Sequence, residues 1–164
     1  MNARVIEHIL STNPYTYHAF QGFNTFDIPL PRITHPAIII LNTDCAEGPG
    51  EHWCVANFVD NNICEFFDPY GFSPCFYDFD KIIYKKAKRI LYNPDRLQGD
   101  LPTCGHHCLF YVLKRYYGNT PDCILNHLYK KDDRSYNDAM VYDFIKNEFG
   151  YNYAKFLPDF NRLF

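Results

Sequence analysis

Two short apolar runs joined by turn-forming residues are the feature that most constrains how this chain of 164 residues can fold. Residues 52–59 and 63–68 are rich in aromatic and β-branched side chains, and Asp60-Asn61-Asn62 between them favours a tight turn. The pattern predicts an antiparallel β-hairpin. In a hairpin the start of the first strand lies beside the end of the second. We therefore expect His52 and Asp68 to meet at one edge of a sheet.

Helical and extended patterns surround this hairpin. Apolar spacing predicts a strand at residues 37–43, a short strand near 89–92, and helices over 4–11, 77–91, 103–117, 121–131 and 137–149. Residues 13–36, which are rich in proline, glycine, asparagine and aromatic residues, are expected to form an irregular arm. The order of helix, strands and then helices indicates the α+β class. The length suits one domain and no internal repeat or linker is visible, so a single domain over residues 1–164 is predicted.

Composition and charge exclude several classes of protein. With 47% hydrophobic and 21% charged residues the chain is globular in composition, and its net charge of −3 offers no basic footprint for nucleic acid. DNA binding is therefore not expected. The longest apolar run, residues 37–41, is far shorter than the ~20 residues that span a bilayer, so no membrane partner is expected either.

The cysteine count is informative about compartment. The chain has seven cysteines, an odd number, and no apolar N-terminal segment typical of a secretory signal. We therefore expect an intracellular reducing compartment and no disulfide framework. There a cysteine serves as a core residue, a metal ligand or a nucleophile. Five of the seven are expected to be structural, namely Cys45, Cys54, Cys64, Cys75 and Cys123.

Cys104 is the candidate nucleophile. It lies where a loop containing Pro102 enters an apolar helix, and a helix N-terminus favours the anionic thiolate. Gly105 beside it would let a substrate carbonyl approach the backbone closely, and Gln98 in the preceding loop offers a neutral donor to an oxyanion. A thiol nucleophile also needs a base and a group that orients the base. The predicted hairpin supplies both in His52 and Asp68.

These residues resemble, in their order and local context, the adenovirus maturation proteases (adenain) and, more distantly, the SUMO-protease superfamily of cysteine peptidases. The family order of His, acid, Gln and Cys is carried by His52-Trp53, by Asp68-Pro69-Tyr70-Gly71, by Gln98 and by Cys104-Gly105. The similarity extends from the N-terminal helix to about Asn126. It implies a central, mostly antiparallel sheet flanked by helices and a papain-like catalytic core.

The resemblance also implies a function. It indicates an intracellular cysteine endopeptidase, acting as a monomer in the host nucleus or cytoplasm and packaged in a virion. Its substrates would be viral capsid or core precursors cut at Gly-rich sites during maturation. Trp53, Gly50, Glu51 and Gly105 would line the narrow substrate cleft.

Three departures from adenain limit this transfer. The acid is Asp68 where mammalian adenain has Glu, and residues 86–97 lack the cysteine that tethers adenain's activating viral peptide by a disulfide. Adenain is basic and uses DNA as a cofactor, whereas this chain carries a net charge of −3. The sequence therefore requires no cofactor, and whether a viral peptide or DNA activates the protein is left open.

Other interpretations compete with the peptidase. Cys104, His106, His107 and Cys108 could offer zinc ligands, but no second Cys/His pair at finger spacing follows, so no metal is expected. Cys108 is expected in the core, with a resolving thiol as the alternative. For the function, a ubiquitin- or SUMO-like deconjugating isopeptidase is the near alternative. A non-enzymatic capsid- or DNA-associated module on a protease scaffold is the more distant one.

Overall fold

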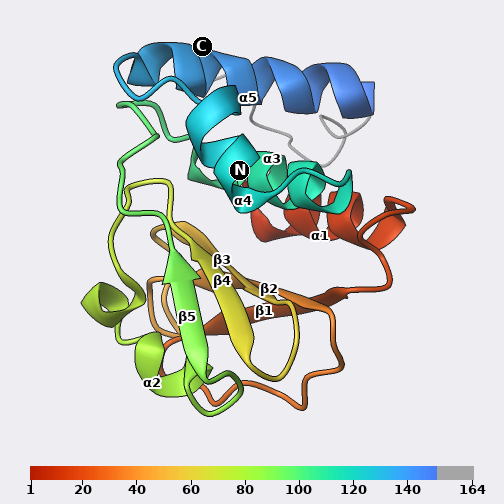
Figure 1. Cartoon of the computed structure of the whole chain (residues 1–164), viewed down its shortest axis with the longest axis vertical. Helices are drawn as coiled ribbons and strands as arrows, with labels where there is room; N and C mark the ends of the chain where they lie inside the picture. Colours follow the sequence, from red (N-terminus) through yellow and green to blue (C-terminus); the bar gives the residue numbers. More distant parts are fainter. Residues whose placement is uncertain (151–164) are drawn as a thin grey trace.

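A five-stranded sheet with helices on both faces forms the framework (Figure 1). The computed structural model describes residues 1–150. The strands lie in the order of the chain: β1 (Phe20–Thr25), β2 (Ala37–Asn42), β3 (Trp53–Phe58), β4 (Ile63–Phe67) and β5 (Arg89–Tyr92). This confirms the α+β class. None of the helices in the described part of the chain combines the length and the hydropathy that crossing a bilayer requires.

The predicted hairpin is present and centres the sheet. β3 and β4 pair antiparallel with Val55 opposite Phe67, and β2 pairs antiparallel with β3. The two outer pairings, β1 with β2 and β4 with β5, are parallel. The sheet is therefore half parallel, where the resemblance implied a mostly antiparallel one. The cause is the length of the connections at residues 26–36 and 68–88, since a parallel pair needs a long crossover.

One strand lies where an irregular arm was expected. β1 occupies residues 20–25 within the predicted 13–36 arm, so that prediction is wrong for this stretch. Its sequence, Phe-Gln-Gly-Phe-Asn-Thr, is half-buried throughout and does not alternate. Pairing with β2 at the sheet edge, rather than local propensity, makes it a strand.

The helix predicted over residues 77–91 is also wrong in extent. The structure has a 3₁₀ turn η1 (Pro74–Tyr77), the four-residue helix α2 (Asp80–Ile83) and then β5. Asp78 adopts the left-handed conformation with φ of 62°, which separates the turn from the helix. Phe79, Ile82 and Ile83 still face the core, so the apolar pattern reported burial correctly but not helix length.

The remaining helices follow the predicted positions. α1 (Ala3–Thr12) is capped by Asn2, whose Oδ1 accepts from the Val5 amide. α3 (Cys104–Tyr116) and α5 (Arg134–Phe149) match their predictions, α5 starting three residues early because Asp133 caps it. The predicted 121–131 helix is a short α4 (Pro121–Cys123) followed by a π turn, η2 (Ile124–Leu128).

The sheet separates two apolar cores. β2 is buried along its whole length because both of its faces are covered. Ile38, Ile40 and Val55 point into the larger core beneath α1, α3 and α5, while Ile39 and Leu41 point to the smaller core beside α2. In Figure 1 the larger helical layer lies above the sheet and α2 lies at its opposite side. The start of α3 is thereby held against β3, where the predicted site residues gather.

Candidate active site

His52 and Asp68 are brought together as the hairpin predicts. His52 directly precedes β3 and Asp68 directly follows β4, and His52 Nε2 lies 2.6 Å from Asp68 Oδ1. Asp68 is fully buried and His52 is 8% exposed. A carboxylate can only accept hydrogen bonds, so Nε2 is the donor and its hydrogen points to Asp68. This orients the imidazole with its other nitrogen free to face a second group.

The Asp68 carboxylate is itself fixed by backbone and side-chain donors. Its Oδ1 accepts from the Tyr70 amide at 3.0 Å, and its Oδ2 accepts from the Phe72 amide at 2.9 Å and the Tyr77 hydroxyl at 3.2 Å. The Asp68 backbone is gripped from both sides by the Asn93 amide, which accepts from Asp68 N and donates to Asp68 O. Each carboxylate lone pair is thus committed, and the orienting group cannot rotate freely.

The Tyr70 ring packs flat against the His52 imidazole. The ring centroids of Tyr70 and His52 lie 4.5 Å apart with an interplanar angle of 19°. The Arg96 guanidinium lies over the Tyr70 ring, with its Cζ 5.2 Å from the ring centroid. Sequence reasoning did not single out Tyr70 as a site residue. The signal that could have found it is its position two residues after Asp68, in the turn where the Tyr70 amide donates to the Asp68 carboxylate.

Cys104 and His52 shift each other's protonation in opposite directions. Burial by itself lowers the pKa of His52, but hydrogen bonds to Asp68 and Cys104 and their negative charges raise it to about 9. Burial raises the pKa of Cys104, but hydrogen bonding and the charge of His52, with the Trp53 backbone and the Met1 ammonium, hold it below its ordinary value. Cys104 is also the first residue of α3, where the helix dipole favours an anion. The pair is therefore set up as thiolate and imidazolium.

The buried cysteines Cys54, Cys64 and Cys108 lack this activation. Burial raises the pKa of Cys54 and Cys108 well above the ordinary thiol value, and the nearby anions raise both further. The Cys108 thiol donates to the Trp53 carbonyl at 3.1 Å, consistent with a core residue. Burial also raises the pKa of Cys64, and all seven cysteines are unpaired. Among the described cysteines whose pKa is displaced, Cys104 alone is shifted toward the thiolate.

Gln98 lies in the loop that leads to α3. The Leu97 and Gln98 amides both donate to the Pro69 carbonyl, which ties this loop to the segment after Asp68. The Gln98 side chain is 1% exposed, and its Nε2 donates to the Leu101 carbonyl at 2.7 Å. One of its two amide hydrogens is left for another acceptor. Its Oε1 has no partner among the described residues.

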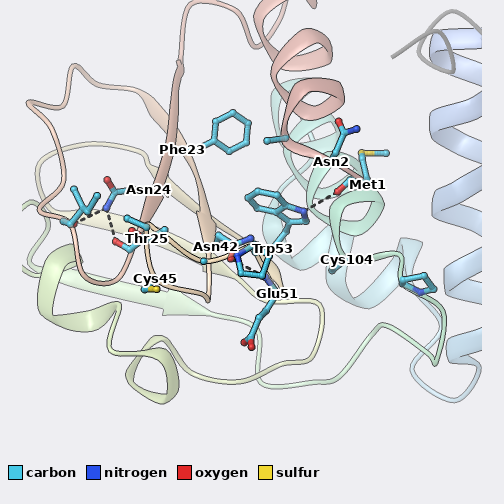
Figure 2. A pocket seen from close by; sticks show the side chains of 17 residues that line it. Met1, Asn2, Phe23, Asn24, Thr25, Asn42, Cys45, Glu51, Trp53 and Cys104 are labelled. Atoms are coloured by element: carbon cyan, nitrogen blue, oxygen red, sulfur yellow. Dashed lines mark hydrogen bonds between the residues drawn. The ribbon is translucent and has the colours of Figure 1, made fainter. Parts of the chain in front are cut away.

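A groove of about 940 Å³ opens beside Cys104. Figure 2 shows Cys104 at one end, Asn24 and Cys45 toward the other, and Trp53 between them. The predicted substrate-binding residues Gly50, Glu51 and Trp53 all line it. Residues that sequence reasoning did not assign to a site line it too, including Met1, Asn2, Phe23 and Asn42. They come from the N-terminus, β1 and β2, and no local pattern links them to the cysteine.

Two of these groove residues are joined by a hydrogen bond. The Trp53 indole donates to the Met1 carbonyl at 3.0 Å, and the Trp53 ring packs against Phe23 with centroids 5.7 Å apart. Trp53 is thus a fixed wall rather than a mobile side chain. It lies directly after His52 in sequence and beside Cys104 in space.

Gly105 is not among the residues that line the groove, and its predicted role beside the substrate stays a prediction. It is buried, and a Cβ built on it would meet the Met1 Cβ at 2.9 Å and Ile6 and Trp53 atoms at 3.4 Å. The glycine lets the first turn of α3 pack against α1 and Trp53. These contacts inside the protein already require a small residue at this position.

Two groups of residues could be considered as metal ligands. His52, Cys54 and Asp68 place one ligand atom each within 4.8 Å of one another, and all three are buried. The 2.6 Å between His52 Nε2 and Asp68 Oδ1 is a hydrogen-bond distance. Two atoms that bind one zinc ion at ~2.0–2.2 Å in tetrahedral geometry lie farther apart than this. The geometry is thus that of an orienting pair.

The second group is the Cys104–Cys108 stretch of α3, and the structure disperses it. His107 binds Tyr129 and Asp138, and Cys108 binds the Trp53 carbonyl. His106 packs against the Tyr142 ring with centroids 5.4 Å apart. Burial, together with the positive charge of the Met1 ammonium, lowers the pKa of His106 to about 3. These side chains do not converge on one point.

Comparison with known proteins supports the fold alone. No protein-family model and no curated protein matches the chain. The solved structure of the ASFV pS273R protease is similar, with a TM-score of 0.51 and 14% identity over 83% of this chain and 64% of that chain. A selenomethionine structure of the same protease is similar with a TM-score of 0.40 and 21% identity over 64% of this chain and 44% of that one.

The present chain thus spans less than two thirds of the length of the protease structure that it matches. The likeness shows a shared fold and does not single out adenain.

Proposed function

We propose that this chain is a cysteine endopeptidase in which Cys104 is the nucleophile, His52 the base, Asp68 the orienting acid and Gln98 an oxyanion donor. One observation carries the proposal. Cys104 and His52, which come from different elements, hold each other's pKa in opposite directions, downward for the thiol and to about 9 for the imidazole. Such displacement by a specific charged partner at the end of a groove is typical of a functional site.

The reaction follows from this arrangement. The Cys104 thiolate attacks the carbonyl carbon of the scissile peptide, a C–S bond forms, and the carbonyl electrons move to the oxygen. When the oxyanion collapses, the C–N bond breaks and the imidazolium of His52 gives its proton to the leaving amine. Neutral His52 then takes a proton from water, which attacks the thioester and releases the acid and the thiol. Asp68 keeps Nε2–H fixed throughout, so the other ring nitrogen handles the protons.

Gln98 is suited to stabilise the oxyanion. Its side chain is buried and donates one amide hydrogen to the Leu101 carbonyl, and its backbone amide donates to the Pro69 carbonyl in the turn after Asp68. The remaining side-chain amide hydrogen therefore has a fixed direction. A fixed donor stabilises developing charge without reorganisation, and loss of one such donor typically costs ~10²–10³ in turnover. The fold likeness to a solved protease supports the same assignment at the level of architecture.

The substrates that we propose are structural precursor proteins of a virus or virus-like element, cleaved at Gly-rich sites. The support is the resemblance to adenain together with the walls of the groove. Trp53 is locked by Met1 and Phe23, and Gly50 faces the groove with φ of +90° and only 3.2 Å between its ideal Cβ position and Asn42. Rigid walls beside the nucleophile favour glycine near the scissile bond.

The test is hydrolysis of a peptide series in which Gly-Gly is replaced stepwise by Ala and Val. We expect the wild type to cleave the Gly-Gly peptide, Cys104→Ala to lose turnover, and Cys75→Ala, a matched change at an exposed thiol, to keep it. Turnover that persists in Cys104→Ala contradicts the proposal. Reaction with a ubiquitin- or SUMO-derived C-terminal probe, without peptide cleavage, would assign the isopeptidase function instead. Arms with and without DNA show whether DNA activates the enzyme.

A further inference from the structure

A second buried His–Asp pair lies behind the site and takes no part in the reaction above. His107 of α3 and Asp138 of α5 are 0% and 1% exposed, and His107 Nε2 lies 3.0 Å from Asp138 Oδ1. The other ring nitrogen, Nδ1, lies 3.1 Å from the Tyr129 hydroxyl. Because a carboxylate only accepts, Nε2 carries the hydrogen and Nδ1 accepts from Tyr129. Burial outweighs the attraction of Asp138 and lowers the pKa of His107, so this ring stays neutral.

The Asp138 carboxylate gathers donors from the loop that carries Gln98. Its Oδ1 accepts from the Gly99 amide at 3.1 Å and the Thr103 hydroxyl at 2.8 Å, and its Oδ2 accepts from the Leu101 amide at 3.3 Å. Burial raises the pKa of Asp138, but these donors and His107 together hold it below the ordinary value. Asp138 is therefore a carboxylate at neutral pH.

The backbone of Leu101 links the Asp138 carboxylate to the Gln98 side chain. The Leu101 N–H donates to Asp138, and the Leu101 carbonyl accepts from Gln98 Nε2 at 2.7 Å and from the Thr103 amide at 2.8 Å. The Leu101 N–H and carbonyl lie on either side of the same Cα, so a shift of the Leu101 backbone would disturb both sets of hydrogen bonds. The position of the Gln98 amide thus depends on a group of α5 that the substrate does not touch.

The neighbouring residue of α5 holds the start of the same loop. Asn137, fully buried, donates to the Leu97 carbonyl at 3.0 Å and to the Lys130 carbonyl at 2.7 Å, and it accepts from the Lys130 amide. Gly99 packs so closely on Asp138 that a Cβ would lie 2.6 Å from Asp138 Oδ2. One turn of α5 therefore holds residues 97–103 at both ends.

Resting on the proposed peptidase function, we propose that Asp138, supported by His107, is a positioning residue for the oxyanion site. It acts through the backbone of Leu101 to aim the Gln98 amide, and it leaves the activation of Cys104 to His52 and Asp68. Loss of the Asp138 charge would then impair stabilisation of the oxyanion while the thiolate–imidazolium pair survives. A merely structural role would instead impair both steps together or neither.

The experiment separates these two steps with two reagents. Iodoacetamide alkylation, followed at Cys104 itself because Cys45 and Cys75 are also exposed, reports on the Cys104 thiolate without creating an oxyanion. The Cys104 thiolate adds to the carbonyl carbon of a Gly-Gly peptide aldehyde, which forms a C–S bond and places an oxygen anion at the oxyanion site. For Asp138→Asn we expect aldehyde affinity and kcat to fall about 10-fold or more, with alkylation within about two-fold of wild type at every pH. Asp143→Asn, the same change at an exposed position of α5, should match the wild type.

Each outcome decides something. If wild-type protein neither alkylates rapidly at neutral pH nor binds the aldehyde, the proposed function fails. If wild type does both and folded Asp138→Asn equals it, or loses alkylation in proportion, only the positioning role is overturned. Should Asp138→Asn fail to fold, Gly99→Ala and Thr103→Val disturb the same contacts from the loop side. Selective loss of aldehyde affinity in these two variants supports the role, and wild-type affinity in both overturns it.

Discussion

The imidazole Nε2 of His52 lies 2.6 Å from Oδ1 of Asp68, across the open end of the β3–β4 hairpin. The residues are 16 positions apart in sequence, and the turn at Asp60 returns the chain to within a hydrogen bond of its starting point. Two groups that must act together are thus held by one supersecondary unit, independently of the helix that carries the thiol.

Asp68→Asn should separate orientation from charge. The amide keeps the shape but removes the negative charge that raises the pKa of His52, so the imidazolium should lose stability and the Cys104 thiolate with it. We expect turnover to fall by at least ~10²-fold. The midpoint of iodoacetamide alkylation should move to higher pH. Asp100→Asn, at an exposed acid, serves as the matched control. An unchanged alkylation midpoint would contradict the pairing.

The pH dependence of turnover should be bell-shaped, with its sign set by the two displaced groups. The acid limb reports protonation of Cys104, whose pKa is lowered, so activity should persist below the usual thiol range. The alkaline limb reports loss of the His52 proton that the leaving amine needs, so turnover should fall above about pH 9. Steady-state kcat/KM from pH 5 to 10 checks this. Activity rising through pH 10 would exclude the imidazolium as the acid.

Gly105→Ala tests whether this glycine is required by packing or by contact with the substrate. Because the added Cβ would meet Met1 and contact Ile6 and Trp53, the variant should lose about 1–3 kcal/mol of unfolding free energy. Urea denaturation measures this directly. For the fraction that remains folded, the KM for short peptides should stay within about two-fold of wild type, because Gly105 does not line the groove. A stable variant with sharply raised KM would restore the predicted substrate contact.

Arg115 and Glu65 offer a prediction about stability away from the site. Glu65 is 6% exposed, and its carboxylate accepts from Arg115 Nε at 2.9 Å and from Arg115 Nη2 at 2.8 Å. The side chains of Asn57 and Tyr111 also donate to this carboxylate. Arg115→Met would leave a buried carboxylate without its cation and should cost about 3 kcal/mol of unfolding free energy. The double variant with Glu65→Gln should recover part of that loss in a thermal or urea scan. A single variant as stable as wild type would refute the argument.

The hairpin and the helix carrying Cys104 could be predicted because their signals are local. Turn chemistry at Asp60-Asn61-Asn62 and apolar runs on both sides determine the pairing, and the polar loop before Cys104 marks the start of α3. β1 could not be predicted, because its half-buried sequence becomes a strand only by pairing with β2. The 77–91 helix failed since the left-handed Asp78 interrupts a continuous apolar pattern.

The same distinction applies to the candidate site. His52 and Asp68 could be paired from the turn between them, and Gln98 and Cys104 from their shared loop. Asp138 could not be assigned to the site from the sequence, where it resembles any polar residue of an amphipathic helix. The Gly99 amide, from which it accepts a hydrogen bond, lies 39 residues earlier in the chain. The packing of Met1 and Trp53 against Gly105 could not be predicted either, because these residues are distant in sequence. Long-range packing, rather than residue type, decides both.

The division of the site between sheet and helices has a consequence for how the enzyme comes into being. The base and its acid belong to a hairpin, the thiol and amide to the loop and helix above it, and the residue that aims the amide to the last described helix. None of these pieces is reactive by itself. On the proposed function, a chain still leaving the ribosome would therefore carry an ordinary thiol, and peptide cleavage would begin only once the final layer has docked.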